Sequence, residues 1–251
     1  MSTGETQAPI HDSRIPIHDS RFTIHVLTIL TAIIVAAGSS QRMGFDKLFA
    51  LLHGRPVLSH SIAAFEQSDA VRDTILVGRA ERLAEYEKLV ARENFKKVSA
   101  IIPGGARRQD SVRRGLERLG DETAFIAVHD AARPLVRPRL IERILQAAQL
   151  HGGAASATPV RDTLKRANCH QMVCGGVERT NLFAVETPQI FRRELLQKAY
   201  AAVFDAGLEI TDEISAVEQI KGQVFLVPNE EPNFKITYPA DLARAELFLR
   251  H

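Results

Sequence analysis

The amino-acid sequence predicts an α/β fold with a mostly parallel sheet, and three observations support this prediction. Apolar, β-branched runs alternate with longer amphipathic patterns from residue 29 onward, which is typical of βαβ units with right-handed crossovers. Polar loops follow the first, third and fourth of these runs. A polar, β-rich segment at residues 159–187 then interrupts the alternation, and we expect it to form an extended β-arm inserted into the domain.

The elements before the arm form four strand and helix pairs. The run from Thr31 to Val35 is apolar or β-branched and predicts a buried strand, and charged amphipathic patterns such as residues 80–92 predict helices. The expected pairs are 29–36 with 57–67, 74–78 with 80–92, 98–102 with 109–119, and 124–128 with 139–150. Ligands of such sheets lie at the carboxyl ends of the strands, so the polar loops would open onto one rim.

The pattern changes after Gly152-Gly153. Gly175-Gly176, inside the expected arm, is a hairpin signal. Helical patterns return at residues 191–205, 212–219 and 239–250, with a strand at 223–227 between the last two.

Composition and charge restrict the class of protein. The 251 residues, 45% hydrophobic and 25% charged, fit one large soluble domain. A net charge of +2 argues against a nucleic-acid coat or a membrane-surface protein, so neither kind of partner is expected. Cys169 and Cys174 are the two cysteines and imply no disulfide framework, so we expect a cytoplasmic protein.

The N-terminal residues lack the strand and helix patterns of the rest of the chain. Residues 1–22 contain a short repeat, with Pro9–Arg14 recurring as Pro16–Arg21, and predict a flexible N-terminal extension before a domain at residues 23–251. The apolar run 26–37 is similar to a secretory signal, but more acidic than basic side chains precede it. It is also too short to span a bilayer, so we interpret it as the first core strand.

The loop after the first strand is the most informative stretch. Small residues at its start (Ala36, Ala37, Gly38) let backbone N–H groups approach a polyphosphate, and Arg42 and Lys47 can neutralise its charge. The pattern A-A-G-x-x-x-R-M-G-x-x-K resembles the nucleotide loop of sugar nucleotidyltransferases. It lacks G-x-G-x-x-G, which argues against a dinucleotide-dependent oxidoreductase.

Further polar clusters follow the other strands. Gly104-Gly105 and Ser111 lie where a helix should begin, which suits an anion or a base edge, or a plain helix cap. Asp130 follows a buried strand and suits magnesium or a ribose hydroxyl. Charged residues on the two sides of the arm suit a binding function or a solvated hairpin.

Taken in order, these clusters resemble those of the 2-C-methyl-D-erythritol 4-phosphate cytidylyltransferase family, from about residue 29 to the C-terminus. The matching motifs are the loop through Arg42 and Lys47, Gly104-Gly105 with Asp110-Ser111-Val112, His129 to Pro134, Pro159 to Arg166, Thr187-Pro188-Gln189 with Phe191, Thr211-Asp212-Glu213, and Asn233 to Thr237 before Pro239-Ala240-Asp241-Leu242. The resemblance implies a Rossmann-like three-layer α/β/α nucleotidyltransferase domain.

The resemblance also implies a reaction. CMP would pass from CTP to 2-C-methyl-D-erythritol 4-phosphate, with release of pyrophosphate, in the non-mevalonate isoprenoid precursor pathway. Such a transfer depends on positioning and charge stabilisation. Arg42 and Lys47 match the family's catalytic transition-state stabilisers. Magnesium, or another divalent cation, would bridge phosphate oxygens near Asp130.

The remaining site residues carried over from the family fall into two groups. The nucleotide-binding residues are Ala36, Ala37, Gly38, Gly105, Ser111 and Asp130. The acceptor-positioning residues are Arg179, Lys235, Arg133, Thr163 and Thr211. The family is similar to an interlocked dimer whose arm reaches the neighbouring site, so we expect a homodimer with Arg179 and Thr163 acting in trans.

One departure and two alternatives remain. The family often carries proline where this chain has Asp46, and an acid there could pair with Lys47 and weaken its grip on phosphate, or face solvent. A ribitol-5-phosphate cytidylyltransferase would share nearly the same nucleotide loops, and the arm pattern favours the methylerythritol enzyme over it. A non-catalytic nucleotide-binding protein is disfavoured because the expected cations are all present.

Overall fold

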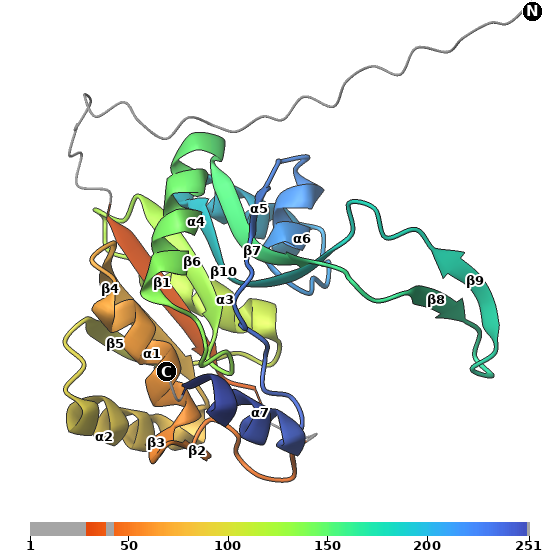
Figure 1. Ribbon diagram of the computed structural model, residues 1–251. Coiled ribbons are helices and arrows are strands. Elements are labelled where there is room, and N and C mark those ends of the chain that lie inside the picture. The colour runs from red at the N-terminus through yellow and green to blue at the C-terminus, as the bar shows by residue number, and fades with distance from the viewer. Residues whose placement is uncertain (1–28, 39–42, 250–251) are drawn as a thin grey trace, which may run out of the picture.

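The computed structural model describes residues 29–38 and 43–249, which form a seven-stranded sheet with helices on both faces (Figure 1). The strands lie in the order β11-β7-β10-β6-β1-β4-β5. Their bounds are β1 Leu30–Ala36, β4 Val71–Gly78, β5 Val98–Pro103, β6 Phe125–Asp130, β7 Gly153–Pro159, β10 Phe183–Arg192 and β11 Phe225–Pro228. The N-terminal extension expected at residues 1–22 and the catalytic candidate Arg42 lie outside the described residues.

The sheet is mostly parallel, as the sequence predicts, and β10 is its antiparallel strand. β1 pairs in parallel with β4 and β6, β4 pairs in parallel with β5, and β7 does so with β11. β10 runs antiparallel to both of its neighbours, β6 and β7. The carboxyl ends of β1, β4, β5 and β6 therefore meet at one rim.

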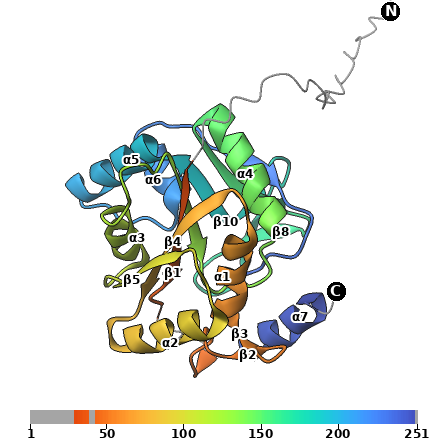
Figure 2. The ribbon, with the colours of Figure 1, turned by 90° about the vertical axis from the view of Figure 1, so that its left-hand side faces the viewer.

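Two helix layers cover the sheet because successive side chains of each strand point to opposite faces. In β1, Ile34 packs in a core with residues of α1 and α4, whereas Ile33 packs in a second core with residues of α3, α5 and α6. Figure 2 shows the sheet between these two groups of helices. The helices are α1 Val57–Gln67, α2 Leu83–Glu93, α3 Arg108–Leu116, α4 Pro138–His151, α5 Arg193–Asp205, α6 Glu213–Gln219 and α7 Pro239–Leu249. The three-layer α/β/α prediction is confirmed.

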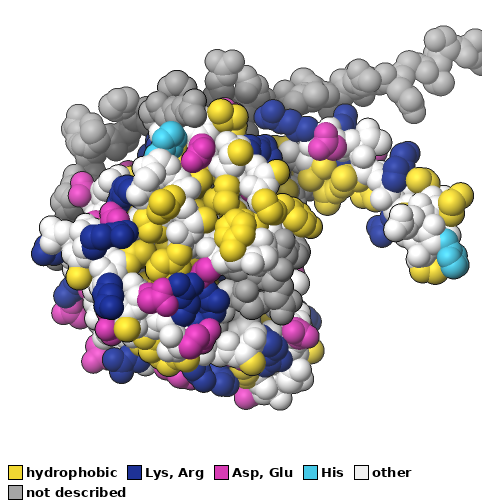
Figure 3. All heavy atoms as spheres, turned by 90° about the horizontal axis from the view of Figure 1, so that it is seen from below, with side chains coloured by type: hydrophobic (Ala, Val, Ile, Leu, Met, Phe, Trp, Pro, Cys, Tyr) yellow, Lys and Arg dark blue, Asp and Glu magenta, His cyan; other side chains and the backbone are white. Residues whose placement is uncertain are grey.

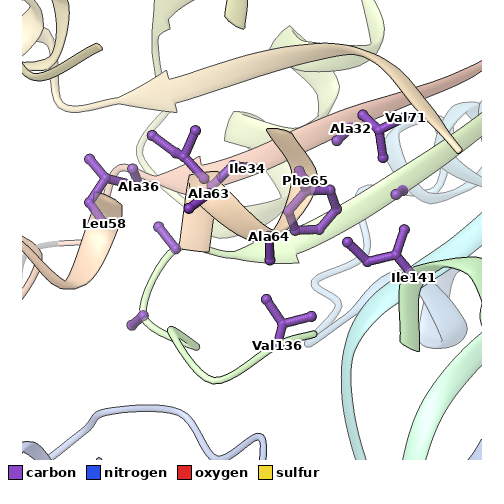
Figure 4. Close-up of a cluster of buried hydrophobic side chains, with 14 of the residues drawn as sticks. Ala32, Ile34, Ala36, Leu58, Ala63, Ala64, Phe65, Val71, Val136 and Ile141 are labelled. Carbon is purple, nitrogen blue, oxygen red and sulfur yellow. The ribbon is translucent and has the colours of Figure 1, made fainter. Parts of the chain in front are cut away.

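The larger core holds β1 in place between its neighbours (Figure 4). Phe65 and Leu58 of α1 are fully buried and lie against Ile34 of β1, while Ile141 of α4 closes the same core. Full burial of one such side chain contributes about 1.5–3 kcal/mol. This packing fixes β1 and carries Ala36, its last residue, to the rim where the polar loops meet.

The arm projects from the body as a separate hairpin of β8 (Leu164–Ala167) and β9 (Val173–Val177). Its turn lies at residues 168–172, where the Asn168 N–H donates to the Met172 carbonyl at 3.0 Å, so the Gly175-Gly176 signal falls inside β9. Met172 and Val173, at and beside this turn, expose about two thirds of their surface. Figure 3 shows hydrophobic side chains at the far end of the arm.

The segments that flank the arm belong to the central sheet. β7 ends at Pro159 and β10 begins at Phe183, so the expected arm at 159–187 includes the ends of two core strands. β10 continues to Arg192, and the helix expected from residue 191 begins at Arg193. The short elements β2 (Leu51–Leu52), β3 (Arg55–Pro56) and η2 (Ala80–Arg82) complete the described fold. Within the described ranges, no helix has the length and apolarity needed to cross a membrane.

The contact between α3 and β1 leads to a stability prediction. A Cβ added at Gly115 would lie 2.7 Å from Ile33 Cγ2, which is buried in the central strand. Gly115→Val should therefore lower the free energy of unfolding by about 1–3 kcal/mol, measured by chemical denaturation. Gly120→Ala is the control because nothing lies within 4 Å of an added Cβ there. A Gly115→Val variant as stable as the unchanged protein would contradict this close packing.

Candidate functional site

A cleft of about 520 Å³ lies at the rim and is lined by all six expected nucleotide-binding residues. β1 ends in it, the loop between β5 and α3 forms one wall, and β6 ends at its base. The expected residues that line it are Ala36, Ala37, Gly38, Lys47, Gly105, Ser111, Asp130 and Lys235. Residues from five separate segments therefore meet in one cavity.

Closely packed backbone at the ends of β4 and β5 supports two of the loops that line the cleft. The Gly104 N–H donates to the Gly78 carbonyl at 2.7 Å, which joins the ends of β4 and β5. A Cβ at Gly104 would lie 2.4 Å from the Cβ of Ala37 and 2.7 Å from Oγ of Ser111. Glycine is therefore required here for two loops to touch.

The start of α3 carries both a cap and a part of the cleft wall. The Asp110 carboxylate accepts from the Arg107 N–H at 3.0 Å, so Asp110 acts as a helix cap. The Ser111 hydroxyl accepts from the Gly105 N–H at 3.1 Å and lines the cleft. The sequence allowed two interpretations of this loop, a helix cap and a binding wall. Asp110 forms the cap, and Ser111 lines the cleft.

Lys47 connects the nucleotide loop to the C-terminal part of the chain. Its Nζ donates to the Ile236 carbonyl at 2.8 Å, next to Lys235 in the same cleft. The neighbouring Asp46 accepts from the Leu48 N–H at 3.1 Å and forms ion pairs with Arg79 and Arg82. The Asp46 carboxylate is thus directed to the segment that follows β4.

Asp130 is the central charged group of the site. Its Oδ1 lies 3.1 Å from Nε of Arg108, and its Oδ2 lies 3.0 Å from Nζ of Lys235 and 3.6 Å from Nε of Arg133. Burial alone would raise the pKa of Asp130, but these three cations outweigh it and hold the pKa well below its usual range. Asp130 is therefore ionised at any physiological pH.

Arg108 and Glu213 form a second buried ion pair behind Asp130. The Arg108 Nη1 and Nη2 donate to the two Glu213 carboxylate oxygens at 2.7 and 3.0 Å, and the Tyr200 hydroxyl donates to the same carboxylate at 2.9 Å. Glu213 is fully buried. Although burial opposes it, the charges of Glu213 and Asp130 raise the pKa of Arg108.

This pair was missed by sequence reasoning. Glu213 belongs to a matching motif and Arg108 lies between Gly104-Gly105 and Asp110-Ser111-Val112, but neither was assigned a role, because 105 positions separate them. The sequence did contain a signal for Glu213. An acid directly after the Asp212 cap lies on the first turn of α6, and an acid there that faces the sheet needs a buried cationic partner.

A second cavity of about 230 Å³ adjoins the cleft and collects the acceptor-positioning candidates of the main body. Arg133, Thr211 and Lys235 line it, together with residues of β10 such as Glu186 and Thr187. Arg108, Asp130 and Lys235 line both cavities. The two spaces therefore meet at one charged wall.

His129, next to Asp130, is held neutral inside the protein. Burial outweighs the attraction of Asp130 and lowers the pKa of His129 to about 3. The Asp130 N–H donates to Oγ1 of Thr187 at 3.0 Å, which leaves the Thr187 hydroxyl hydrogen for Nδ1 of His129 at 3.1 Å. His129 Nε2 then carries the proton, facing the Arg133 carbonyl at 3.3 Å. His129 therefore has a structural role and stays uncharged at neutral pH.

The arm candidates lie apart from both cavities of this chain. Thr163 and Arg179 are exposed, and the Arg179 guanidinium donates to the Arg161 carbonyl within the arm. Neither residue is among those that line the cleft or the second cavity. Of the expected site residues, these two are the ones that the described chain does not bring to the rim.

The fit to a divalent cation rests on one acid. Among the residues that line the cleft, Asp130 alone has a carboxylate, and both of its oxygens already face cations. The described ranges contain no group of three or more His, Cys, Asp or Glu side chains placed to hold a metal. Magnesium in such sites takes one or two carboxylates and substrate phosphates, so this wall fits a cation whose ligands come chiefly from a nucleotide.

Comparisons with known proteins show the family of this chain. Residues 30–251 match the family model described as 2-C-methyl-D-erythritol 4-phosphate cytidylyltransferase (IspD). The chain is 44% identical over 220 residues to the enzyme of that name from Dehalococcoides mccartyi strain CBDB1, covering 87% of this chain and 95% of the relative. It is 38% identical to the one from Desulforamulus reducens, covering 88% and 96%.

A solved structure gives the same result. The 2-C-methyl-D-erythritol 4-phosphate cytidylyltransferase of Thermus thermophilus superimposes with a TM-score of 0.72 at 34% identity, covering 88% of this chain and 98% of that one. Fold, site motifs and sequence similarity extend over the same residues. The chain belongs to the 2-C-methyl-D-erythritol 4-phosphate cytidylyltransferase family.

Proposed function

We propose that this protein transfers CMP from CTP to 2-C-methyl-D-erythritol 4-phosphate, forming 4-diphosphocytidyl-2-C-methyl-D-erythritol and pyrophosphate for isoprenoid precursor synthesis. The observation that carries this proposal is the shared wall of the two cavities, where Arg108, Asp130 and Lys235 face both. Two anionic substrates that must react with each other need adjoining sites with a common cationic boundary. The two cysteines are exposed and free, which fits the reducing cytoplasm.

On the nucleotide side, the cleft supplies backbone and cations. Gly38 and Gly105 present backbone to the base and ribose with no side chain in the way, and Ser111 lies beside them. Lys47 stands at the same cleft, fixed to the Ile236 carbonyl, and would neutralise charge that builds up on the α-phosphate. Arg42 is proposed to join it from the preceding loop.

On the acceptor side, the cations of the second cavity would hold the nucleophile. Arg133 donates from Nη1 to the Asn233 carbonyl at 2.7 Å, and this contact braces the segment that carries Lys235. Thr211 adds a hydroxyl at the edge of the same cavity. Lys235 and Arg133 would bring a phosphate oxygen of the acceptor in line with the α-phosphorus, and the pyrophosphate leaves on the opposite side.

Magnesium is proposed as the cofactor. Bound to the triphosphate, it would neutralise phosphate charge and orient the leaving group. Asp130, at the end of β6, is the residue that would face the ribose and this cation. The chain's own contribution is the fixed carboxylate at the base of the cleft.

A homodimer is proposed because the arm has no role in the chain's own site. Arg179 and Thr163 are exposed on a hairpin that leads away from both cavities, and its tip exposes Met172 and Val173. Exposed apolar side chains on such a projection suit contact with a second copy. In a two-fold dimer, each arm would bring Arg179 to the acceptor cavity of its neighbour.

The direct test of the function is turnover with defined acceptors. Purified protein, CTP and magnesium should release pyrophosphate fastest with 2-C-methyl-D-erythritol 4-phosphate, because the chain belongs to the family named for that acceptor. Coupled pyrophosphate detection with each polyol phosphate in turn makes the measurement. Faster turnover of ribitol 5-phosphate would identify that compound as the acceptor instead. No turnover with any polyol phosphate would favour a non-catalytic nucleotide-binding protein.

Mixing two inactive variants tests the proposed arrangement in trans. Lys47→Ala should lower turnover about 10²–10³-fold while CTP binding stays measurable, because it removes one charge stabiliser. Arg179→Ala should also lose turnover. Equal amounts, mixed and allowed to exchange subunits, should regain about a quarter of the unchanged activity, since half of the dimers would each contain one intact site. A mixture with no recovered activity would place Arg179 in its own chain's site.

The ion pairs of Asp46 predict whether a substitution of this residue raises or lowers kcat. Because Arg79 and Arg82 hold its carboxylate, Asp46 should orient the loop that ends in Lys47. Asp46→Asn loses the charge-assisted bonds and should lower kcat about 3- to 10-fold. Glu85→Gln, which removes an exposed acid that also pairs with Arg82, is the matched control and should stay near the unchanged rate. A higher kcat in Asp46→Asn would instead mean that the acid restrains Lys47.

A further inference from the structure

A chain of polar groups leads from Arg108, in the shared wall of the two cavities, into the protein, and the proposed chemistry assigns no role to its inner members, Glu213 and Tyr200. Tyr200 of α5 donates to Glu213 at the start of α6, and Glu213 receives both Nη groups of Arg108 at the start of α3. Glu213 is fully buried and Tyr200 is 3% exposed. Three helices on one face of the sheet thus join to hold a single guanidinium.

The contacts of Asp130 divide between its two oxygens. Oδ1 receives Nε of Arg108 at 3.1 Å. Oδ2 faces Lys235 at 3.0 Å and Arg133 at 3.6 Å. All three cations line the acceptor cavity, and Arg108 is the one of the three that a second acid, Glu213, also holds.

An acceptor phosphate would compete with Asp130 for the ammonium group of Lys235, whose three N–H donors can turn from one anion to the other. The Lys235 side chain is 38% exposed, on a flexible stem that lines both cavities. When it turns to a phosphate, Asp130 loses its closest partner on Oδ2. A buried carboxylate that loses a partner becomes costly, so something must stabilise it at that moment.

We infer that Arg108, fixed by Glu213 and Tyr200, is a positioning residue that holds Asp130 in place so that Lys235 can leave it for the acceptor's phosphate. The inference rests on the proposed function and adds a group of residues to it. A guanidinium suits the task because its planar fork can hold Glu213 with both Nη groups and still donate to Asp130 from Nε. A lysine at this position has no such fork.

The test separates acceptor binding from nucleotide binding. Without the Glu213 charge, Arg108 is no longer anchored, so Asp130 retains Lys235. Glu213→Gln should raise the KM for the polyol phosphate acceptor about tenfold, and Tyr200→Phe about threefold, because each weakens a hydrogen bond to a charged group. The Kd of CTP, measured by calorimetry without acceptor, should stay within about twofold. Glu218→Gln, an exposed acid on the same helix, is the matched control.

The nearly isosteric Tyr200→Phe guards against a trivial loss of folding, and thermal unfolding is followed for every variant. A KM for the acceptor within about twofold of the unchanged protein in Glu213→Gln would overturn the inference. Equal losses of CTP and acceptor binding, in step with a lower Tm, would also overturn it, because they mark a purely structural role.

Calorimetry with inorganic phosphate keeps this inference distinct from the proposed function, since binding needs no turnover. Weaker phosphate binding by Glu213→Gln than by the unchanged protein supports the inference even if pyrophosphate is never released. Phosphate binding that is equal in the two proteins overturns the inference even where the unchanged protein is fully active.

Discussion

The site depends on one buried carboxylate. Asp130 ends β6, and its two oxygens join α3 through Arg108, the segment after β11 through Lys235, and its own loop through Arg133. Removing charges from water is expensive, so such a cluster adds little to stability in itself. Its contribution is to the geometry of the site, because it gathers three cations from distant parts of the chain around one carboxylate.

The net charge of this cluster suits two anionic substrates. Asp130 and Glu213 offset two of the three cations, which leaves the wall cationic without leaving a buried charge unpaired. Two polyanions repel each other, and a wall of this sign that faces both cavities lets them approach. The two acids reduce the net positive charge of the wall, and therefore keep the affinity for anionic products low enough for the products to dissociate.

The fold was largely predictable from sequence because its strands are apolar and its helices amphipathic. The strand that begins at Leu30 and helix α1 match their patterns closely. β10 was the difficult element, because Glu186 and Thr187 interrupt its apolar pattern where the register shifts between Val185 and Gln189. In the site, the loop motifs predicted that Lys47 and Asp130 share one rim, and the structure adds Lys235 to the cleft that they line. Which partners Asp46 and Glu213 take depends on contacts between distant segments, and no local pattern records those.

The close packing of Gly105 has a consequence for inhibitor design, because this residue lines the cleft. An added Cβ would lie 2.3 Å from the Asp110 Cβ there, and at the neighbouring Gly104 it would lie 2.4 Å from the Ala37 Cβ. A side chain that contacts a compound can be exchanged by a single mutation, and such an exchange weakens binding of the compound. A compound seated on the backbone of Gly105 would meet atoms that a substitution cannot change without displacing the loops that form the cleft.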